Sequence, residues 1–214
     1  MKTIASCVER LIKHQPFVED ALARKIINYS ALAEDYQPSI EKILGKSVNN
    51  GSIIMALRRY HPQKRINQKQ VRDLGDIVVR SGITDFTFLN SNTILDSQGK
   101  LLDQVKHIPK AYFTYSSTFH ESNVLVSNNL TEVVKTCFAQ ETCVTIKSDL
   151  SSLSIALPED NSKTVGLYFY IFKLLAYEGI PVFEVLSTSN YFTLFLEVQY
   201  VNQAFALINE IKGG

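Results

Sequence analysis

Apolar and polar residues follow two different rhythms along the chain, and the change falls near position 75. Before it, apolar residues recur three or four positions apart, as in Ile4, Val8, Leu11 and Ile12, which is the spacing of one face of an α-helix. After it, short runs of β-branched and aromatic residues are separated by helical segments. The pattern predicts a helical part over residues 1–74, followed by a mixed part.

Capping and helix-breaking residues divide the helical part into shorter segments. Ser30 is expected to cap a short helix, because a serine hydroxyl accepts hydrogen bonds from free amides at a helix start. Pro38 suits the first turn of a separate helix, and Gly45 is expected to end it. Asn49 is placed to cap a last helix, which Pro62 would stop. The sequence therefore predicts several helices with short connections.

The mixed part contains an internal repeat. The segment VVRSGITDFTFL, which begins at Val78, aligns with TIKSDLSSLSIAL, which begins at Thr145. Each copy reads strand, strand, helix, strand, strand, helix, over about 70 residues. A four-stranded antiparallel sheet with two helices on one face buries this pattern economically. We therefore expect an α+β protein with two ferredoxin-like (ββαββα) modules, over residues 75–140 and 141–214.

Charge is distributed unevenly along the chain, although the total is only +1. Residues 1–75 contain 13 Lys and Arg against 7 Asp and Glu, a net charge of +6. Residues 76–214 contain 9 against 14, a net charge of −5. The two parts are thus expected to have different partners, and the basic part favours a polyanion such as DNA.

The last predicted helix is the candidate for contact with nucleic acid. Three helices with short connections are compatible with a helix-turn-helix unit, whose last helix enters the major groove. Basic residues that suit DNA phosphates gather at the end of this helix and just beyond it: Arg58, Arg59, Lys64 and Arg65. Basic residues near a helix C-terminus are also favoured by the helix dipole. A helical bundle used for dimerisation or for contact between domains is the alternative, and the helix dipole favours it over DNA binding.

No known catalytic or metal-binding motif occurs in the sequence. The three cysteines are scattered without a C-x-x-C pair, so neither a disulfide framework nor a zinc site is expected. The histidines also lack ligand spacing: His14, His61, His107 and His120. The longest apolar run, residues 165–176, is too short to span a bilayer. The sequence predicts a cytoplasmic protein that is not an enzyme and has no cofactor.

Residues 164–190, TVGLYFYIFKLLAYEGIPVFEVLSTSN, resemble an ACT module. The resemblance is specifically to the paired regulatory modules at the C-terminus of aspartate kinases, without the kinase part. That family shows Thr-Pro-Gly-Val at the start of a helix, Ala-Gly-Ile at its end, and a strand that ends in Ser-Thr-Ser. Thr164 and Gly166 fit the helix start, and Gly179 fits its end. Val165 departs from the family, which has proline there, and one extra residue lies near Pro181.

The resemblance implies an amino-acid site at the loop that enters the first helix of a module. A ligand carboxylate would bind the free amides at the helix N-terminus, and its ammonium would bind carboxylate or carbonyl oxygens. It also implies that the two modules lie side by side in one eight-stranded sheet. The candidate ligand-binding residues are Asp160, Asn161, Ser162, Thr164, Val165, Gly166, the rim residues Ser187, Thr188 and Ser189, and Asn92 in the first module.

Three functional hypotheses follow from these observations. The first is a homodimeric regulatory protein that binds an amino acid through paired ACT-like modules. The second is a ligand-responsive transcriptional regulator that binds DNA through its basic helices. The third is a purely structural pair of modules, because polar loops before helices are often only caps.

Overall fold

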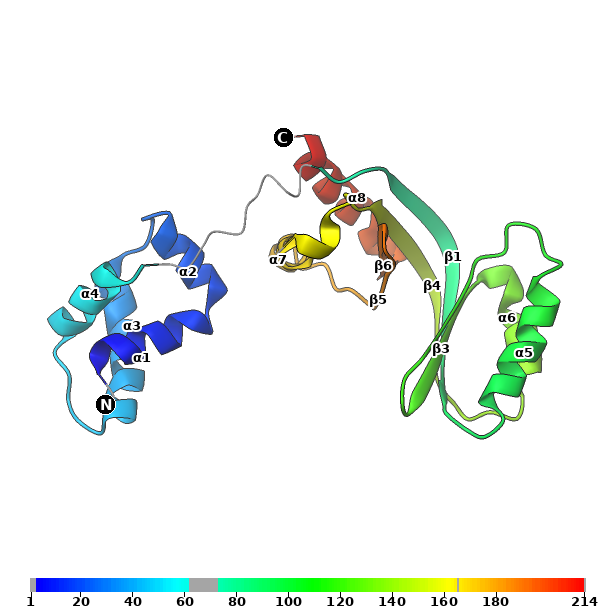
Figure 1. The fold of residues 1–214 in the computed structure, drawn as a ribbon, viewed down its shortest axis with the longest axis horizontal. Helices are drawn as coiled ribbons and strands as arrows, with labels where there is room; N and C mark the ends of the chain where they lie inside the picture. The colour runs from blue at the N-terminus through cyan, green and yellow to red at the C-terminus, as the bar shows by residue number, and fades with distance from the viewer. Residues whose placement is uncertain (1–2, 62–72, 165, 214) are drawn as a thin grey trace. The chain divides into compact units, whose positions relative to one another are not determined.

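The computed structural model describes residues 3–61, 73–164 and 166–213. The chain divides into two compact units, Met1–Asn67 and Gln68–Gly214. The described part of the first unit is helical, and the second unit is built on one antiparallel sheet (Figure 1).

Within residues 3–61, the first unit contains four helices, α1 (Ile4–Lys13), α2 (Pro16–Ala23), α3 (Tyr29–Leu44) and α4 (Asn50–Arg59). Their apolar faces share one core, whose most buried members are Val8, Ile12, Ala33, Tyr36, Ile40, Ile53 and Leu57. Two partly buried hydroxyls connect the helices: the Tyr36 hydroxyl donates to Gln15 Oε1 (2.7 Å), and the Tyr60 hydroxyl donates to Glu19 Oε1 (2.6 Å). Burial raises the pKa of Tyr36 to about 12, so both tyrosines remain hydrogen-bond donors at neutral pH.

Helix α3 corrects the prediction of two separate helices in this region. It runs through Pro38 without a break, and its N-cap is Asn28 rather than Ser30. The Asn28 side chain accepts hydrogen bonds from the amides of Ser30 and Ala31. Pro38 removes one helical hydrogen bond, yet the helix continues because it buries an apolar face on both sides of the proline. Gly45 ends the helix at a φ of +68°, as predicted.

Six strands form the sheet of the second unit, in the order β2-β3-β1-β4-β6-β5, and every pair is antiparallel. Their bounds are β1 (Ile77–Leu89), β2 (Phe113–Ser117), β3 (Glu121–Ser127), β4 (Cys143–Ala156), β5 (Glu184–Ser187) and β6 (Tyr191–Glu197). The helices are α5 (Ile94–Val105), α6 (Thr131–Cys137), α7 (Leu167–Tyr177) and α8 (Val198–Gly213), with short 3-10 turns η2 (Asn128–Leu130) and η3 (Asn161–Lys163).

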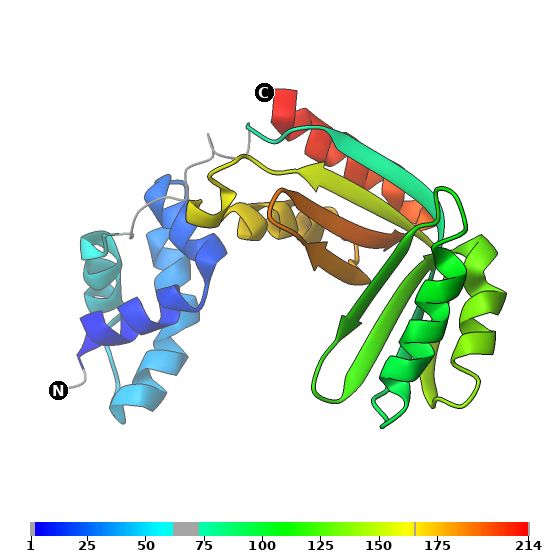
Figure 2. The ribbon, with the colours of Figure 1, turned by 45° about the vertical axis from the view of Figure 1, so that its right-hand side comes forward.

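The prediction of eight strands is wrong, because the first two strands of each repeat are a single long strand. β1 and β4 run side by side through the middle of the sheet (Figure 2). Gly82 and Asp149 occupy equivalent positions in them, with φ of +74° and +58°, and the register of the pair shifts beside each. A bulge of this kind bends a strand without ending its pairing. The break between the first two predicted strands of each repeat is therefore a bulge within one strand.

The sheet consists of two half-sheets that exchange strands. The first half-sheet contains β2, β3, residues 83–89 of β1 and residues 143–147 of β4. The second contains β5, β6, residues 150–156 of β4 and residues 77–80 of β1. Each half-sheet has the strand order of a ferredoxin-like fold, but its closing strand comes from the other repeat. The sheet is thus not divided at residue 141.

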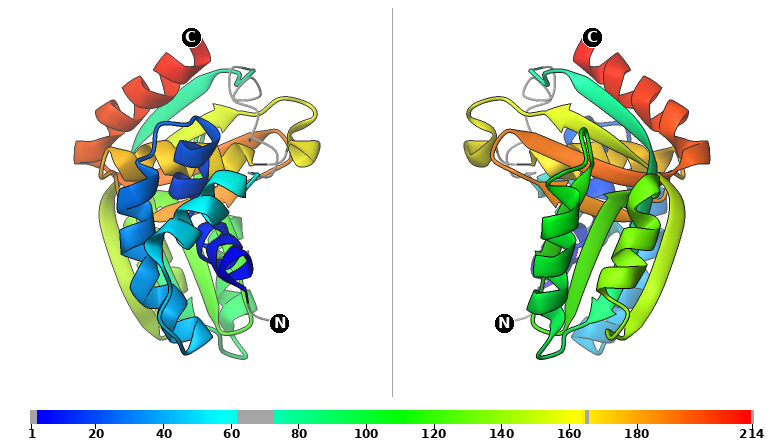
Figure 3. Two further views of the ribbon diagram at one scale, coloured as in Figure 1. Left: turned by 90° about the vertical axis from the view of Figure 1, so that its left-hand side faces the viewer. Right: turned by 90° about the vertical axis from the view of Figure 1, so that its right-hand side faces the viewer.

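Each half-sheet is covered by helices on one face. Helices α5 and α6 lie side by side against the first (Figure 3, right), and α7 and α8 pack on the second. Alternate residues point to the opposite face, and four of them form one buried cluster between the half-sheets, named here the crease cluster: Ile83, Leu125, Leu150 and Phe195. The sheet curls sharply at this point (Figure 1).

Candidate functional site

The structure brings together two of the predicted segments, the loop between β4 and α7 and the turn between β5 and β6. The Asn161 side-chain amide donates to the carbonyl of Pro158 (2.9 Å) and to the carbonyl of Ser189 (2.7 Å). The amide of Leu157 donates to the carbonyl of Asn190 (2.8 Å). These bonds fix the loop against the turn, so the polar residues 187–190 lie beside the start of α7.

The first turn of α7 makes a second connection. The Tyr168 hydroxyl lies 3.0 Å from Ser187 Oγ, and its ring packs on Phe192 with centroids 4.7 Å apart. The Thr164 hydroxyl donates to the carbonyl of Asp160 (3.1 Å), which closes the loop around η3. The site is thus a short polar loop held between a helix start and a hairpin turn.

The other predicted ligand residues lie at the edge of this loop. Asp160, Ser162 and Thr188 are exposed, and Asp160 Oδ1 lies 3.8 Å from the Lys163 ammonium. Val165 lies outside the described residues. Asn92 lies in the turn before α5, in the first half-sheet, and therefore belongs to the other copy of the loop.

The start of α7 has a left-handed residue and no side-chain cap. Gly166 is the N-cap, with a φ of +85°, and no side chain of the described residues caps the helix. The first amides of a helix have no partner within it, and they carry partial positive charge from the helix dipole. This end of α7 is suited to an acceptor that is negatively charged.

The corresponding position in the first repeat is filled by a carboxylate that sequence analysis missed. Glu141 accepts hydrogen bonds from the hydroxyls of Ser91 (2.5 Å), Thr93 (2.9 Å) and Ser97 (2.7 Å) at the start of α5. Partial burial alone would raise the pKa of Glu141, but the hydroxyl donors and nearby Lys100 lower it below its usual value. The carboxylate is therefore ionised at neutral pH and stabilises the start of α5.

The second repeat has a glycine where the first has Glu141. The amide of Leu89 donates to the carbonyl of Thr142 (3.0 Å), and in the same way the amide of Ala156 donates to the carbonyl of Asp76 (2.9 Å). Gly75 is therefore the counterpart of Glu141. A Cβ atom at Gly75 would lie 2.8 Å from the Cβ of Ala156, so the backbone leaves no room for a side chain. The loop before the helix is also longer, residues 157–166 against 90–93.

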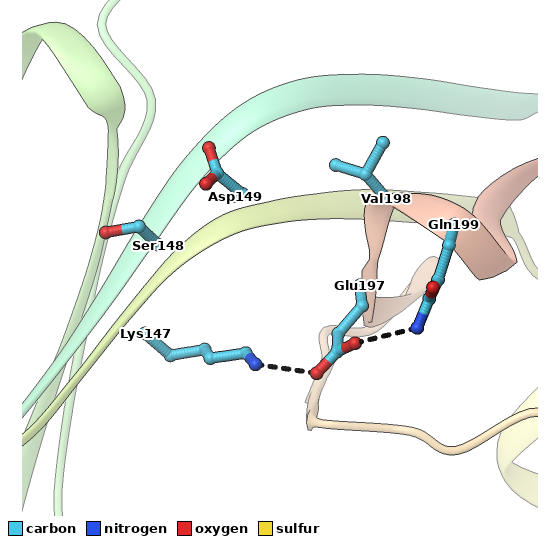
Figure 4. Close-up of a pocket in the computed structure, with 6 residues that line it drawn as sticks. All are labelled: Lys147, Ser148, Asp149, Glu197, Val198 and Gln199. Atoms are coloured by element: carbon cyan, nitrogen blue, oxygen red, sulfur yellow. Dashed lines mark hydrogen bonds and ion pairs between the residues drawn. The ribbon is translucent and has the colours of Figure 1, made fainter.

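A shallow hollow of about 310 Å³ lies where β4 bends and β6 meets α8 (Figure 4). The Lys147 ammonium forms an ion pair with Glu197 (2.6 Å), and the Gln199 amide donates to the same carboxylate (3.1 Å). Asp149 provides the bulge residue beside it. Lys147 and Glu197 neutralise each other, so Asp149 is the charged lining residue outside that ion pair.

Two of the four candidate nucleic-acid residues are described, and both lie on the exposed side of α4. Arg58 and Arg59 are exposed together with Ser52 and Met55, whereas Ile53 and Leu57 are buried. The Arg58 guanidinium lies 6.0 Å from the centroid of the Tyr29 ring. Lys64 and Arg65 lie outside the described residues.

Within residues 3–61, 73–164 and 166–213, no three His, Cys, Asp or Glu side chains converge on a point where they would hold a metal. No helix in these ranges combines the length and the apolar character required to cross a bilayer.

Comparison with known proteins gives matches among solved structures alone. No family model and no curated protein matches the sequence. The ligand-free regulatory subunit of aspartate kinase from Thermus thermophilus is similar, with a TM-score of 0.51 at 8% identity over 64% of this chain and 98% of that one. Aspartate kinase from Clostridium acetobutylicum gives 0.54 at 15% identity, over 71% of this chain and 37% of that one.

A third similar structure is Escherichia coli aspartokinase III in complex with aspartate and ADP. It gives a TM-score of 0.52 at 12% identity, over 64% of this chain and 33% of that one. At such identities the likeness establishes the fold alone. It confirms, at the level of the fold, the resemblance to the regulatory part of aspartate kinases that residues 164–190 indicated.

Proposed function

We propose that this protein is a non-catalytic regulatory protein that binds a free amino acid in its second half-sheet. The fold is that of a regulatory subunit of aspartate kinase, and one protein of similar fold is described in complex with aspartate. A soluble regulator in the cytoplasm also fits the cysteines, of which Cys7, Cys137 and Cys143 are all free.

The difference between the two repeats is the observation that carries this proposal. The first repeat supplies its own carboxylate, Glu141, to the start of the helix after its long strand. The second repeat has Gly75 at that position, which offers no carboxylate to the loop before α7. Neither α5 nor α7 has a side-chain cap among the described residues. A ligand carboxylate would bind the free amides at the start of α7.

The loop before α7 offers acceptors for the ammonium group of an amino-acid ligand. Asp160 is exposed at the edge of the loop, where its carboxylate would attract the ligand's ammonium. The carbonyls of Pro158 and Ser189 converge on the Asn161 amide, so the same loop is rich in acceptors. Asn161 would act by holding the loop against the turn rather than by binding the charge itself.

Regulation requires that the ligand bind one conformation better than another. The exchange of strands between the half-sheets would transmit a change at α7 to the rest of the sheet. We further propose a homodimer, because residues 77–80 and 143–147 each lie on an edge of a half-sheet with exposed Val78 and Val144. A dimer would allow one ligand to change the arrangement of two subunits.

A second candidate function is DNA binding by the first unit. The observation in its favour is the exposed surface of α4, where Arg58 and Arg59 lie beside Ser52. Replacement of both arginines by glutamate would abolish binding to duplex DNA if α4 contacts phosphates. Binding that persists in the double variant would mean that α4 does not contact the duplex.

The direct test is a thermal-shift screen of the full chain against the standard amino acids. A ligand at a hundred times its dissociation constant adds about 2.7 kcal/mol to the free energy of unfolding, which gives a clear rise in melting temperature. Asp160→Ala and Asn161→Ala should reduce that rise. Asn92→Ala, in the other copy of the loop, is the matched control and should leave it unchanged.

Two results would contradict the proposal. If no amino acid raises the melting temperature, a purely structural pair of modules is favoured. A rise that is lost with Asn92→Ala but kept with the two loop variants would move the site to the first half-sheet.

A further inference from the structure

Asp85 is a carboxylic acid buried in the sheet on the face that the helices do not cover. It lies in β1, between Thr84 and Phe86, and its neighbour Phe86 packs in the helix-covered core. Only 1% of Asp85 is exposed. Its register partners are Leu125 of the crease cluster and Lys147. Asp85 therefore lies at the junction of the two half-sheets, and the proposed amino-acid site does not use it.

The groups around Asp85 leave its charge uncompensated. The Asn123 amide of β3 donates a hydrogen bond to it, and Thr87 of its own strand is a further donor. Lys147 of β4 is the cation in register with it, but its ammonium forms an ion pair with Glu197 of β6 (2.6 Å). Cys143 of β4 is the other titratable group on that side.

The acidic neighbour of Asp85 comes from the opposite half-sheet. Glu184 of β5 is near enough to disfavour the ionised form of Asp85. Burial is the larger cause, and together with Glu184 it raises the pKa of Asp85 to about 6, although Asn123 and Thr87 act in the opposite direction. Asp85 thus changes its charge in a pH range where an ordinary aspartate is already ionised.

The crease joins the half-sheets through contacts between apolar side chains. The crease cluster takes Ile83 and Leu125 from the first half-sheet and Leu150 and Phe195 from the second. The Tyr112 ring of the first half-sheet lies against Phe195, with centroids 6.3 Å apart. Such contacts are not directional, so charge repulsion across them would alter the angle between the half-sheets.

We infer that the crease is a pH-sensitive hinge, in which the protonation of Asp85 decides how closely Glu184 and the second half-sheet approach the first. With Asp85 protonated, the crease closes, because one buried charge and its repulsion of Glu184 disappear. With Asp85 ionised, the crease opens and admits water to the carboxylate. This goes beyond the proposed amino-acid binding and stands whether or not a ligand exists.

The test is a distance between two spin labels in the full chain, one on each half. Labels at Asp96→Cys in α5 and Asn202→Cys in α8 occupy exposed helix positions, in a background with Cys7→Ala, Cys137→Ser and Cys143→Ser. Pulsed electron spin resonance is recorded at about pH 5 and about pH 7.5, on either side of the Asp85 transition. The expected result is a shift of the distance distribution between the two pH values.

Three variants make the outcome specific. Asp85→Asn should hold the distance at its low-pH value at both pH values, and Glu184→Gln should shrink the shift. If Asp85→Asn does not fold, the distance shift in Glu184→Gln still tests the repulsion between Asp85 and Glu184. Glu121→Gln, an exposed acid on β3, is the matched control and should behave as the parent. A parent distance that is the same at both pH values, or a full shift retained in Asp85→Asn or Glu184→Gln, would overturn the inference.

Discussion

Glu141 shows how a single residue decides the character of each repeat. Its contacts join residues that are 44 to 50 positions apart in the sequence. Its counterpart Gly75 lacks both a side chain and the room for one. The loop before α5 therefore has a carboxylate that joins its hydroxyls, and the second repeat has no side chain at the equivalent position.

Glu141→Ala should destabilise the protein. The three hydroxyls at the start of α5 would lose their common acceptor, and the free energy of unfolding should fall by about 1–3 kcal/mol. Urea unfolding measures this. Glu132→Ala removes an exposed partner of Lys135 and is the control, for which a change of at most about 1 kcal/mol is expected. Equal effects of the two variants would show that Glu141 contributes no more than a surface charge.

The same contacts predict a pH dependence with a definite sign. Folding lowers the pKa of Glu141, so its contribution is fully present above the ordinary value of 4.5 and is lost as the pH falls through the lower folded value. Between about pH 7 and about pH 3, the parent should lose more unfolding free energy than Glu141→Gln, which has no such charge to lose. Asp85 is present in both the parent and Glu141→Gln, so its contribution to the pH dependence is the same in the two proteins and does not affect their difference. Parallel stability curves would contradict the assignment.

At the scale of elements, the two bulges determine the architecture. Gly82 bends β1, and Asp149 bends β4 at the equivalent position. Each bend allows one strand to serve both half-sheets. The crease cluster packs next to these bends, so Ile83 and Leu150, the residues directly after the bulges, become the centre of the junction.

Gly82→Ala tests the first bulge. A non-glycine residue at a φ of +74° costs about 1–2 kcal/mol, and the nearest atom to a new Cβ would be 3.7 Å away, so crowding adds nothing. Thermal or urea unfolding should show a loss of that size. Asp149→Gly is the matched control. It places a glycine, which tolerates positive φ, in the equivalent position of β4, and should change stability by less than Gly82→Ala does. A neutral Gly82→Ala would mean that the bulge conformation carries no strain.

The sequence predicted the elements better than their continuity. The alternating runs located β5 and β6 and the helices between the strands, because those elements are bounded by polar turns. A Ser-Gly pair at 81–82 has the composition of a turn, and a bulge needs the same positive φ, so the pattern alone cannot distinguish them. The predicted helix boundary at Pro38 was wrong for a related reason. Burial of Tyr36 and Ile40 in the core stabilises the helix more than the proline destabilises it.

The candidate site was predictable where it depends on neighbours in the sequence and not where it depends on distant ones. The resemblance to ACT modules indicated Asn161, Thr164 and Gly166 as candidate ligand residues, and these lie in one loop and the helix start that follows it. Glu141 was not, because its role depends on Ser91 and its neighbours about fifty positions earlier. The excess of hydroxyls before α5, with no acid in the same loop, is the signal that would have indicated a distant carboxylate.

At the scale of the second unit, the exchange of strands makes the halves interdependent. Residues 143–147 complete the first half-sheet, and residues 77–80 complete the second. A chain cut after residue 140 should therefore lack a stable first half-sheet, even though it ends at an apparent module boundary. Circular dichroism and amide exchange would check this. Cooperative unfolding of the truncated chain, with the strand signal of an intact half-sheet, would contradict strand exchange.

The proposed function requires one amino-acid site per chain, at the start of α7, and none at the start of α5. Isothermal titration calorimetry of the full chain with the amino acid found by the thermal-shift screen measures the stoichiometry directly. We expect one site per chain, an affinity that falls at least about tenfold, or 1.4 kcal/mol, in Asn161→Ala, and an unchanged affinity in Asn92→Ala. Two equal sites per chain, or full affinity in Asn161→Ala, would contradict it.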